Sequence, residues 1–143
     1  MKEVNVIYWS STGNTQAMAE AVGAGVEEAG GKANVMEVSA ADVSMLKDAD
    51  SFALGASAMG DEELDAEMDD FVTAVEGICA GKTVGLFGSY DWGDGEWMRK
   101  WADRMIEAGA TVVNGEGLIC QETPDDAMIE ECKNLGKALA ANA

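Results

Sequence analysis

A loop rich in hydroxyl and amide side chains is the first segment whose residue types could do chemistry. Residues 10–15 read Ser-Ser-Thr-Gly-Asn-Thr and lead into a segment with helical spacing of small and apolar residues. Backbone N–H groups, hydroxyls and the positive end of a helix dipole converge there, as they do where proteins hold a phosphate. The loop has no Lys or Arg and lacks the GxxxxGK[ST] pattern, so we expect a phosphate to be bound and not transferred. The alternative is a helix cap, but one side-chain oxygen satisfies a cap and this loop offers five.

Two further loops carry groups that suit a flat ring. Residues 57–63 read Ser-Ala-Met-Gly-Asp-Glu-Glu, and residues 90–96 read Tyr-Asp-Trp-Gly-Asp-Gly-Glu. The Trp92 ring stands among glycines and acids, where it is free to stack, and the polarizable Met59 thioether suits the opposite face of such a ring. Taken alone, Trp92 is more typical of a local hydrophobic cluster or a partner anchor, Met59 of core packing, and Glu62 of a solvated acid that enters a helix. Trp97 and Trp101 share a helix face, so we interpret them as packing residues.

The elements that must position these loops alternate between strands and helices. Strands are predicted at 4–9, 32–37, 51–56, 82–89 and, with an interruption, at 111–113 and 117–120. Helices are predicted at 16–28, 65–79, 97–108 and from Pro124 to about Ala140, with a short connecting helix at 43–47. This alternation indicates one α/β domain with a five-stranded parallel sheet covered on both faces. Ligands bind beyond the carboxyl ends of such strands, which is where the three loops lie.

Composition excludes several functional classes. The chain has 143 residues, 27 Asp plus Glu against 9 Lys plus Arg, a formal charge of −18 and no His. Such a surface repels nucleic acid and anionic lipid, and the lack of His excludes His-dependent nucleophiles and His-containing zinc sites. No long apolar stretch or signal-peptide pattern is present, so we expect a soluble cytoplasmic protein.

The cysteines and the acidic run carry no predicted chemistry. Cys79, Cys120 and Cys132 are widely spaced and odd in number, so we interpret them as reduced packing thiols. The acids from 61 to 70 lack the order of a calcium-binding EF-hand loop and are typical of a solvated helix face. No metal site and no catalytic residue are therefore predicted.

Three motifs at successive strand ends resemble those of flavodoxins. They are Ser-x-Thr-Gly-Asn-Thr from residue 10, Ala-Met-Gly-Asp-Glu from residue 58, and Leu-Phe-Gly-Ser-Tyr-x-Trp-Gly-Asp-Gly-x-Trp-Met-Arg from residue 86. The chain is most similar to the short-chain clostridial type, because only residues 114–116 interrupt the fifth strand. The resemblance implies a single flavodoxin-like domain over 1–143, a doubly wound sheet of order 2-1-3-4-5, and non-covalently bound FMN. It also implies an electron carrier without substrate turnover of its own.

The resemblance further implies which residues bind FMN. Trp92 and Met59 should cover the two faces of the isoalloxazine, with Gly60 and Asp61 near its N5 and Glu62 bonded to its N3–H. The implied phosphate contacts are Ser10, Ser11, Thr12, Gly13, Asn14, Thr15 and Ser57. Ala58 is implied as a contact beside Met59. The implied contacts on the ribityl and pyrimidine side are Ser89, Tyr90, Asp91 and Gly93. Two positions depart from the family pattern, because Ser11 and Asp91 stand where Gly is common. An Asp would tolerate a positive φ at position 91 less readily than Gly.

Charge leads to an expected redox role. The three loops contain no cation, and residues 48–81 hold ten acids and no basic residue. Repulsion by these acids should disfavour the anionic hydroquinone of the flavin and lower the potential of the second reduction. Gly60 can turn its carbonyl toward a protonated N5, which favours the neutral semiquinone. We therefore expect a low-potential one-electron carrier that cycles between neutral semiquinone and anionic hydroquinone. Expected partners are redox enzymes with basic docking patches, of the ferredoxin-partner type, and the protein is expected to be a monomer.

Two alternatives belong to other classes. One is an FMN-dependent quinone or NAD(P)H reductase on a related fold, although the chain offers no second domain or extra loop to position a nicotinamide. The other is a phosphate-responsive receiver module. A receiver would place acids at the end of the first strand and an Asp after the third, where this chain has Ser10 and Ser57.

Overall fold

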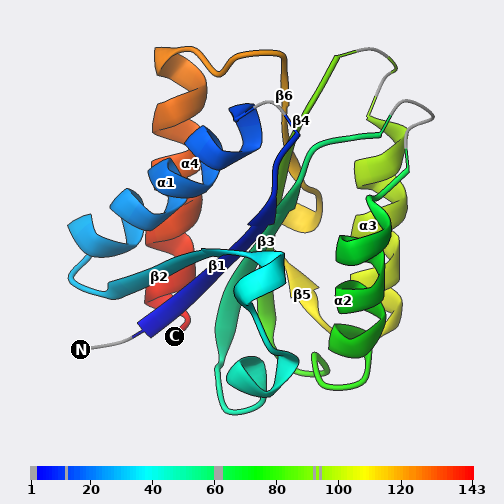
Figure 1. Cartoon of the computed structure of the whole chain (residues 1–143). Coiled ribbons are helices and arrows are strands. Elements are labelled where there is room, and N and C mark those ends of the chain that lie inside the picture. The colour runs from blue at the N-terminus through cyan, green and yellow to red at the C-terminus, as the bar shows by residue number, and fades with distance from the viewer. Residues whose placement is uncertain (1–2, 12, 60–62, 92, 94) are drawn as a thin grey trace.

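A parallel sheet forms the centre of the molecule (Figure 1). The computed structural model describes residues 3–11, 13–59, 63–91, 93 and 95–143. The strands are β1 (Glu3–Trp9), β2 (Lys32–Glu37), β3 (Ser51–Ala56), β4 (Thr83–Tyr90), β5 (Thr111–Val112) and β6 (Leu118–Gln121). They pair in parallel in the order β2-β1-β3-β4-β5, with β6 also on β4, which confirms the predicted order.

Helices cover both faces of the sheet. They are α1 (Asn14–Glu28), α2 (Ala66–Glu76), α3 (Glu96–Glu107) and α4 (Asp126–Ala141), with short 3₁₀ turns η1 (Val38–Ala40), η2 (Val43–Leu46) and η3 (Val113–Gly115). Figure 1 shows α1 and α4 on one side of the sheet and α2 and α3 on the other. β3 is buried along its whole length because its apolar side chains face a helix layer on each side.

Each helix layer encloses its own hydrophobic cluster. Val22, Cys132 and Leu139 belong to the cluster under α1 and α4, and Phe52 and Trp101 to the one under α2 and α3. α1 and α4 approach closely, since a Cβ at Gly25 would overlap the Lys133 carbonyl group. All three cysteines are buried free thiols, as predicted.

The element boundaries differ from the predicted ones where local capping decides them. α4 begins at Asp126, two residues after Pro124, because the Asp125 carboxylate caps it by accepting the Met128 N–H at 2.9 Å. The predicted fifth strand is divided into β5 and β6 by η3, in which Asn114 adopts a left-handed backbone at φ 64°. η1 was not predicted, since a three-residue turn has no periodicity to detect.

The described residues provide neither a membrane-spanning helix nor a metal-binding cluster. Within 3–11, 13–59, 63–91, 93 and 95–143 no helix is long and apolar enough to cross a membrane. Those residues also form no cluster of three or more His, Cys, Asp or Glu side chains that could hold a metal ion.

Candidate functional site

The loop between β1 and α1 forms an open helix N-terminus. Gly13 is the N-cap of α1 at φ 94°, a left-handed conformation that glycine adopts without strain, and it has no side chain to cap the helix. The Ser10 hydroxyl oxygen accepts the Gly13 N–H at 3.0 Å and the Gln16 N–H at 3.4 Å. The N–H groups of a first helical turn have no acceptors within the helix, so this end of α1 suits a bound anion.

Three buried hydroxyl groups meet next to this loop. The Thr15 Oγ1 lies 2.8 Å from the Ser57 Oγ and 2.9 Å from the Ser89 Oγ. Thr15 Oγ1 also accepts the Ser89 backbone N–H at 3.2 Å, and Ser57 Oγ accepts the Ser11 N–H at 3.4 Å. We call Thr15, Ser57 and Ser89 the hydroxyl triad. It joins α1, the loop after β3 and the end of β4, and therefore fixes the three predicted loops to one another.

The loop after β3 is held by backbone hydrogen bonds. The Ser57 N–H donates to the Trp9 carbonyl at 3.2 Å, and the Ala58 N–H donates to the Ser89 carbonyl at 2.9 Å. The Met59 N–H donates to the Glu63 carbonyl at 3.0 Å, which brings residues 59 and 63 together. The Met59 side chain is 38% exposed, so its thioether is accessible to a ligand at this sheet edge.

The loop after β4 is tied to the neighbouring β6. The Gln121 Nε2 donates to the Asp91 carbonyl at 3.2 Å, and the Glu122 N–H donates to the Tyr90 carbonyl at 2.8 Å. Asp91 is not among the described residues with a positive φ, whereas Gly93 adopts φ 93°. Asp91 therefore avoids the strain that a positive φ would have caused, and the left-handed conformation in this loop falls on Gly93.

The structure brings the described part of the predicted site to one edge of the sheet. That part comprises Ser10, Ser11, Gly13, Asn14, Thr15, Ser57, Ala58, Met59, Ser89, Tyr90, Asp91 and Gly93. These residues follow or end the parallel strands β1, β3 and β4, whose carboxyl ends point the same way. The predictions for Thr12, Gly60, Asp61, Glu62 and Trp92 fall outside the described residues.

Comparison with known proteins decides the family. The flavodoxin family model matches residues 6–136. The chain is 43% identical over 138 residues to a flavodoxin from Clostridium beijerinckii, covering 96% of this chain and 99% of that one. It is 44% identical over 138 residues to a flavodoxin from Megasphaera elsdenii, covering 96% and 98%. The chain belongs to the flavodoxin family.

Solved flavodoxin structures share the fold. The solution structure of two-electron reduced Megasphaera elsdenii flavodoxin aligns with a TM-score of 0.88 at 44% identity, covering 96% of this chain and 98% of that one. A flavodoxin from the domain Archaea aligns at 0.85 and 32% identity, covering 97% and 96%. Flavodoxins bind FMN and are electron-transfer proteins, not enzymes.

The described residues fit FMN. The N-terminus of α1, whose N-cap Gly13 has no side chain, and the surrounding hydroxyls suit the phosphate of this cofactor, which needs donors and no catalytic lysine. The exposed Met59 thioether suits an aromatic ring face. FMN supplies the redox chemistry of a flavodoxin, while the protein binds it and sets the charge around it.

Cations near the site come from α3, which sequence reasoning missed. The flavodoxin loops contain no cation, yet Lys100 and Arg104 line the same pocket as Met59. Each is paired with acids: Arg104 lies 2.6 Å from Asp69 and 3.0 Å from Glu76, and the Lys100 Nζ lies 3.4 Å from a Glu96 oxygen. Lys100 and Arg104 are one helical turn apart and lie beside Trp97 and Trp101 in the sequence. This spacing was the signal that could have placed the two cations next to the site.

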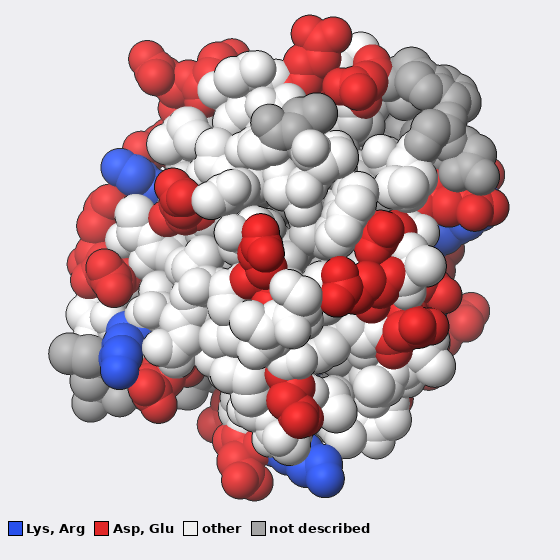
Figure 2. Space-filling view, in the orientation of Figure 1, with Lys and Arg blue, Asp and Glu red and all other residues white. Residues whose placement is uncertain are grey.

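Acids dominate the visible surface of this flavodoxin. Figure 2 shows red carboxylates spread over the whole face, with only a few blue cations at its margins. The ten acids of residues 48–81 are therefore part of a wider distribution of negative charge. The described acids at the start of α2 also have local roles, since Asp65 caps the helix and Asp69 pairs with Arg104.

Proposed function

We propose that this flavodoxin is a low-potential carrier of single electrons that cycles its FMN between neutral semiquinone and anionic hydroquinone. The observation that supports this most is the charge of −18, together with the pairing with acids of Lys100 and Arg104, the two cations that line the same pocket as Met59. Neither residue contributes an unpaired positive charge. The negative charge that reduction adds to bound FMN is therefore repelled by the net negative charge of the protein.

We propose that the FMN contacts follow the family pattern. The phosphate would be held by Ser10, Ser11, Thr12, Gly13, Asn14 and Thr15, with Ser57. Met59 and Trp92 would cover the two faces of the ring, with Ala58 beside Met59, Gly60 and Asp61 near its N5 and Glu62 bonded to its N3–H. The ribityl and pyrimidine side would be lined by Ser89, Tyr90, Asp91 and Gly93. The open N-terminus of α1 and the exposure of Met59 support this proposal. Thr15 is 0% exposed, and its Oγ1 lies 2.8 Å from the Ser57 Oγ. We therefore propose that Thr15 acts mainly by orienting Ser57, and less by direct contact with the phosphate.

The partners we propose are redox enzymes of the ferredoxin-partner type that carry basic docking patches. Complementary charge steers such encounters and raises the association rate. The spread of acids over the visible face supports this (Figure 2). We propose that the carrier acts as a cytoplasmic monomer. Sedimentation of the FMN-loaded protein at working concentration tests whether it is monomeric.

Stepwise reduction followed by absorption spectroscopy tests the redox cycle. The FMN-loaded protein should accumulate the blue neutral semiquinone at half reduction, and its second electron should enter at a much lower potential than its first. Glu62→Gln removes one charge from the proposed ring contacts with little change in shape, and should raise the second potential. Thr111→Val, far from the loops at β5, is the control and should leave both potentials unchanged. A direct two-electron reduction without a blue intermediate would refute the cycle.

Salt dependence tests the partner chemistry. Electron transfer from the reduced flavodoxin to a basic c-type cytochrome should slow as ionic strength rises, because exposed charges are screened within about 10 Å at 0.1 M salt. An acidic cytochrome is the control, and its rate should rise with salt. A rate to the basic cytochrome that does not change with ionic strength would contradict electrostatic docking.

A further inference from the structure

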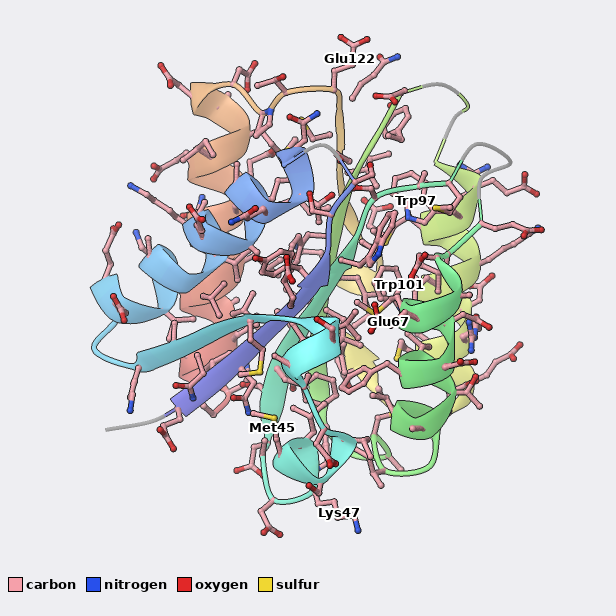
Figure 3. The ribbon with its side chains drawn as sticks, in the orientation of Figure 1. Met45, Lys47, Glu67, Trp97, Trp101 and Glu122 are labelled. Carbon is pink, nitrogen blue, oxygen red and sulfur yellow. The ribbon has the colours of Figure 1, made fainter. Side chains whose placement is uncertain are left out.

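The end of β6 holds the start of the loop after β4 by two hydrogen bonds. Gln121, the last residue of β6, lies opposite Tyr90 in the sheet. The Glu122 N–H donates to the Tyr90 carbonyl at 2.8 Å, and the Gln121 Nε2 donates to the Asp91 carbonyl at 3.2 Å. Figure 3 shows Glu122 at the top of the view, above the ends of β4 and β6 that Figure 1 labels. We call Gln121 and Glu122 the β6 clamp, because they hold two successive carbonyl groups.

Glu122 holds its place in the clamp against its own conformational preference. Its backbone has φ 60°, in the left-handed region that residues other than glycine seldom adopt. Such a residue costs conformational free energy and persists only where surrounding contacts hold it. Gln121 and Glu122 are both exposed, so burial of their side chains does not account for the conformation. The hydrogen bond from the Glu122 N–H ties this backbone to Tyr90 and therefore to the loop.

The far end of the same loop also lies against β6. Gly95, the N-cap of α3, is buried, and a Cβ added to it would lie 2.9 Å from the Ile119 Cδ1. At the near end, the Tyr90 ring packs against Trp97 of α3, with ring centroids 5.5 Å apart. Both ends of segment 90–95 are therefore fixed by contacts within the protein, and β6 takes part at each end.

We propose that Gln121 and Glu122 are positioning residues for FMN, which hold the loop after β4 where it binds the flavin. This inference rests on the proposed function, in which residues 90–93 contact the cofactor and neither clamp residue does. A loop that occupies its binding position for only part of the time binds its ligand more weakly by that fraction, whereas a loop fixed in advance avoids this loss. The β6 clamp thus sets FMN affinity through the loop and without touching the cofactor.

Gln121→Met tests the side-chain half of the clamp. Met has nearly the length of Gln but no donor, so the Asp91 carbonyl loses this hydrogen bond. Fluorescence titration of the apoprotein should give an FMN dissociation constant about fivefold higher than that of the unaltered protein. Asn142→Leu is the matched control, because the Asn142 Nδ2 also donates to a backbone carbonyl, that of Ala138 at 2.8 Å, and lies at the opposite end of the molecule (Figure 1). It should leave FMN binding unchanged.

A double-mutant cycle tests whether Gln121 acts through the loop. Trp92→Ala removes the proposed ring contact of that loop, so Gln121→Met should weaken FMN binding much less in this background than in the unaltered protein. Inorganic phosphate gives a second reading, because it can occupy the phosphate loop but has no ring to contact the loop after β4. Its dissociation constant should be the same for Gln121→Met and the unaltered protein.

Two substitutions of Glu122 test the backbone half of the clamp. Glu122→Gly and Glu122→Val both remove the carboxylate and both keep the backbone N–H. Glycine adopts φ 60° without strain, whereas a β-branched residue is strongly disfavoured there. Glu122→Val should therefore raise the FMN dissociation constant about tenfold, and Glu122→Gly should leave it unchanged.

Four results would overturn the proposal. Equal FMN affinity of Gln121→Met and the unaltered protein would show that this side chain does not position the loop. Equal losses with and without the Trp92 ring would show that Gln121 acts elsewhere, and weaker phosphate binding in Gln121→Met would show a general loosening of the protein. Equal affinities of Glu122→Gly and Glu122→Val would show that the left-handed backbone has no part in binding.

The proposed FMN contacts are tested separately by Trp92→Ala alone. If Trp92→Ala weakens FMN binding and the clamp variants do not, the clamp fails and the proposed contacts stand. If Trp92→Ala has no effect, the proposed contact of this loop with the ring fails.

Discussion

The Thr15 Oγ1 lies 2.9 Å from the Ser89 Oγ, although 74 residues separate them in the chain. The same Thr15 oxygen lies 2.8 Å from the Ser57 Oγ, and all three side chains are buried. Buried hydroxyls are costly unless they are hydrogen-bonded, so each member of the hydroxyl triad stabilises the other two. The triad therefore links the phosphate loop to both loops that we expect to hold the flavin ring.

Removal of the central hydroxyl should loosen all three loops. Thr15→Val keeps the β-branched shape and leaves Ser57 and Ser89 with fewer partners. We expect the free energy of unfolding to fall by about 1–3 kcal/mol and FMN binding to weaken about tenfold or more. Urea unfolding and fluorescence titration of the apoprotein with FMN measure the two effects. Thr111→Val, at an exposed position of β5, should change neither. Unaltered FMN affinity in Thr15→Val would show that the triad serves stability alone.

Loss of the predicted stacking ring should weaken the cofactor complex. Trp92→Ala should reduce FMN affinity by about 1–3 kcal/mol if the indole lies against the isoalloxazine. Trp92→Phe retains an aromatic face and should lose less. Fluorescence titration gives both dissociation constants. Equal affinity of all three proteins would count against stacking at this position.

The ion pairs of Arg104 should stabilise the α2–α3 layer. Its guanidinium bridges Asp69 and Glu76 at 2.6 and 3.0 Å, and its side chain is only 29% exposed. Arg104→Met should therefore lower the free energy of unfolding by about 1–2 kcal/mol, since it breaks two partly buried pairs at once. Lys100→Met is the control, because its pair with Glu96 is exposed and should contribute less than about 0.5 kcal/mol. Similar urea midpoints for the two variants would contradict the bridge.

Alkaline pH should destabilise the fold through Cys132. Burial raises the pKa of this thiol from 9.0 to about 12. Below pH 9 the thiol is protonated in both native and unfolded chains, and its contribution to stability is constant. Above pH 9 the unfolded chain loses the proton and the native chain keeps it. The free energy of unfolding should then fall by up to about 1.4 kcal/mol per pH unit until pH 12.

A variant isolates that contribution. Burial also raises the pKa of Cys79 and Cys120, so part of the alkaline slope comes from them. Cys132→Ala removes one titrating group while keeping a small apolar side chain. Its stability, measured by urea unfolding from pH 8 to 11, should decline less steeply than that of the unaltered protein. Parallel declines would mean that Cys132 does not titrate on unfolding.

Local sequence signals were enough for the alternation of strands and helices and for the loop positions, whereas the strand order was implied by the resemblance to flavodoxins. Parallel strands buried on both faces read as apolar runs, and the loops that follow them contain turn and capping residues. Boundaries that depend on a single side chain, such as the Asp125 cap of α4, were not predicted. The division of the fifth strand was visible at residues 114–116, but the pairing of both halves with β4 was not.

The sequence by itself determined that three loops of phosphate- and ring-binding character meet at one sheet edge, because strand direction and loop composition are local properties. Only the tertiary structure decided how those loops are joined and what surrounds them. The contacts of Thr15 with Ser57 and Ser89, the approach of Lys100 and Arg104 to Met59, and the hydrogen bonds of Gln121 and Glu122 to the loop after β4 all depend on packing between distant segments. Such packing leaves no periodic trace in the chain, since it is the three-dimensional fit of side chains that selects it.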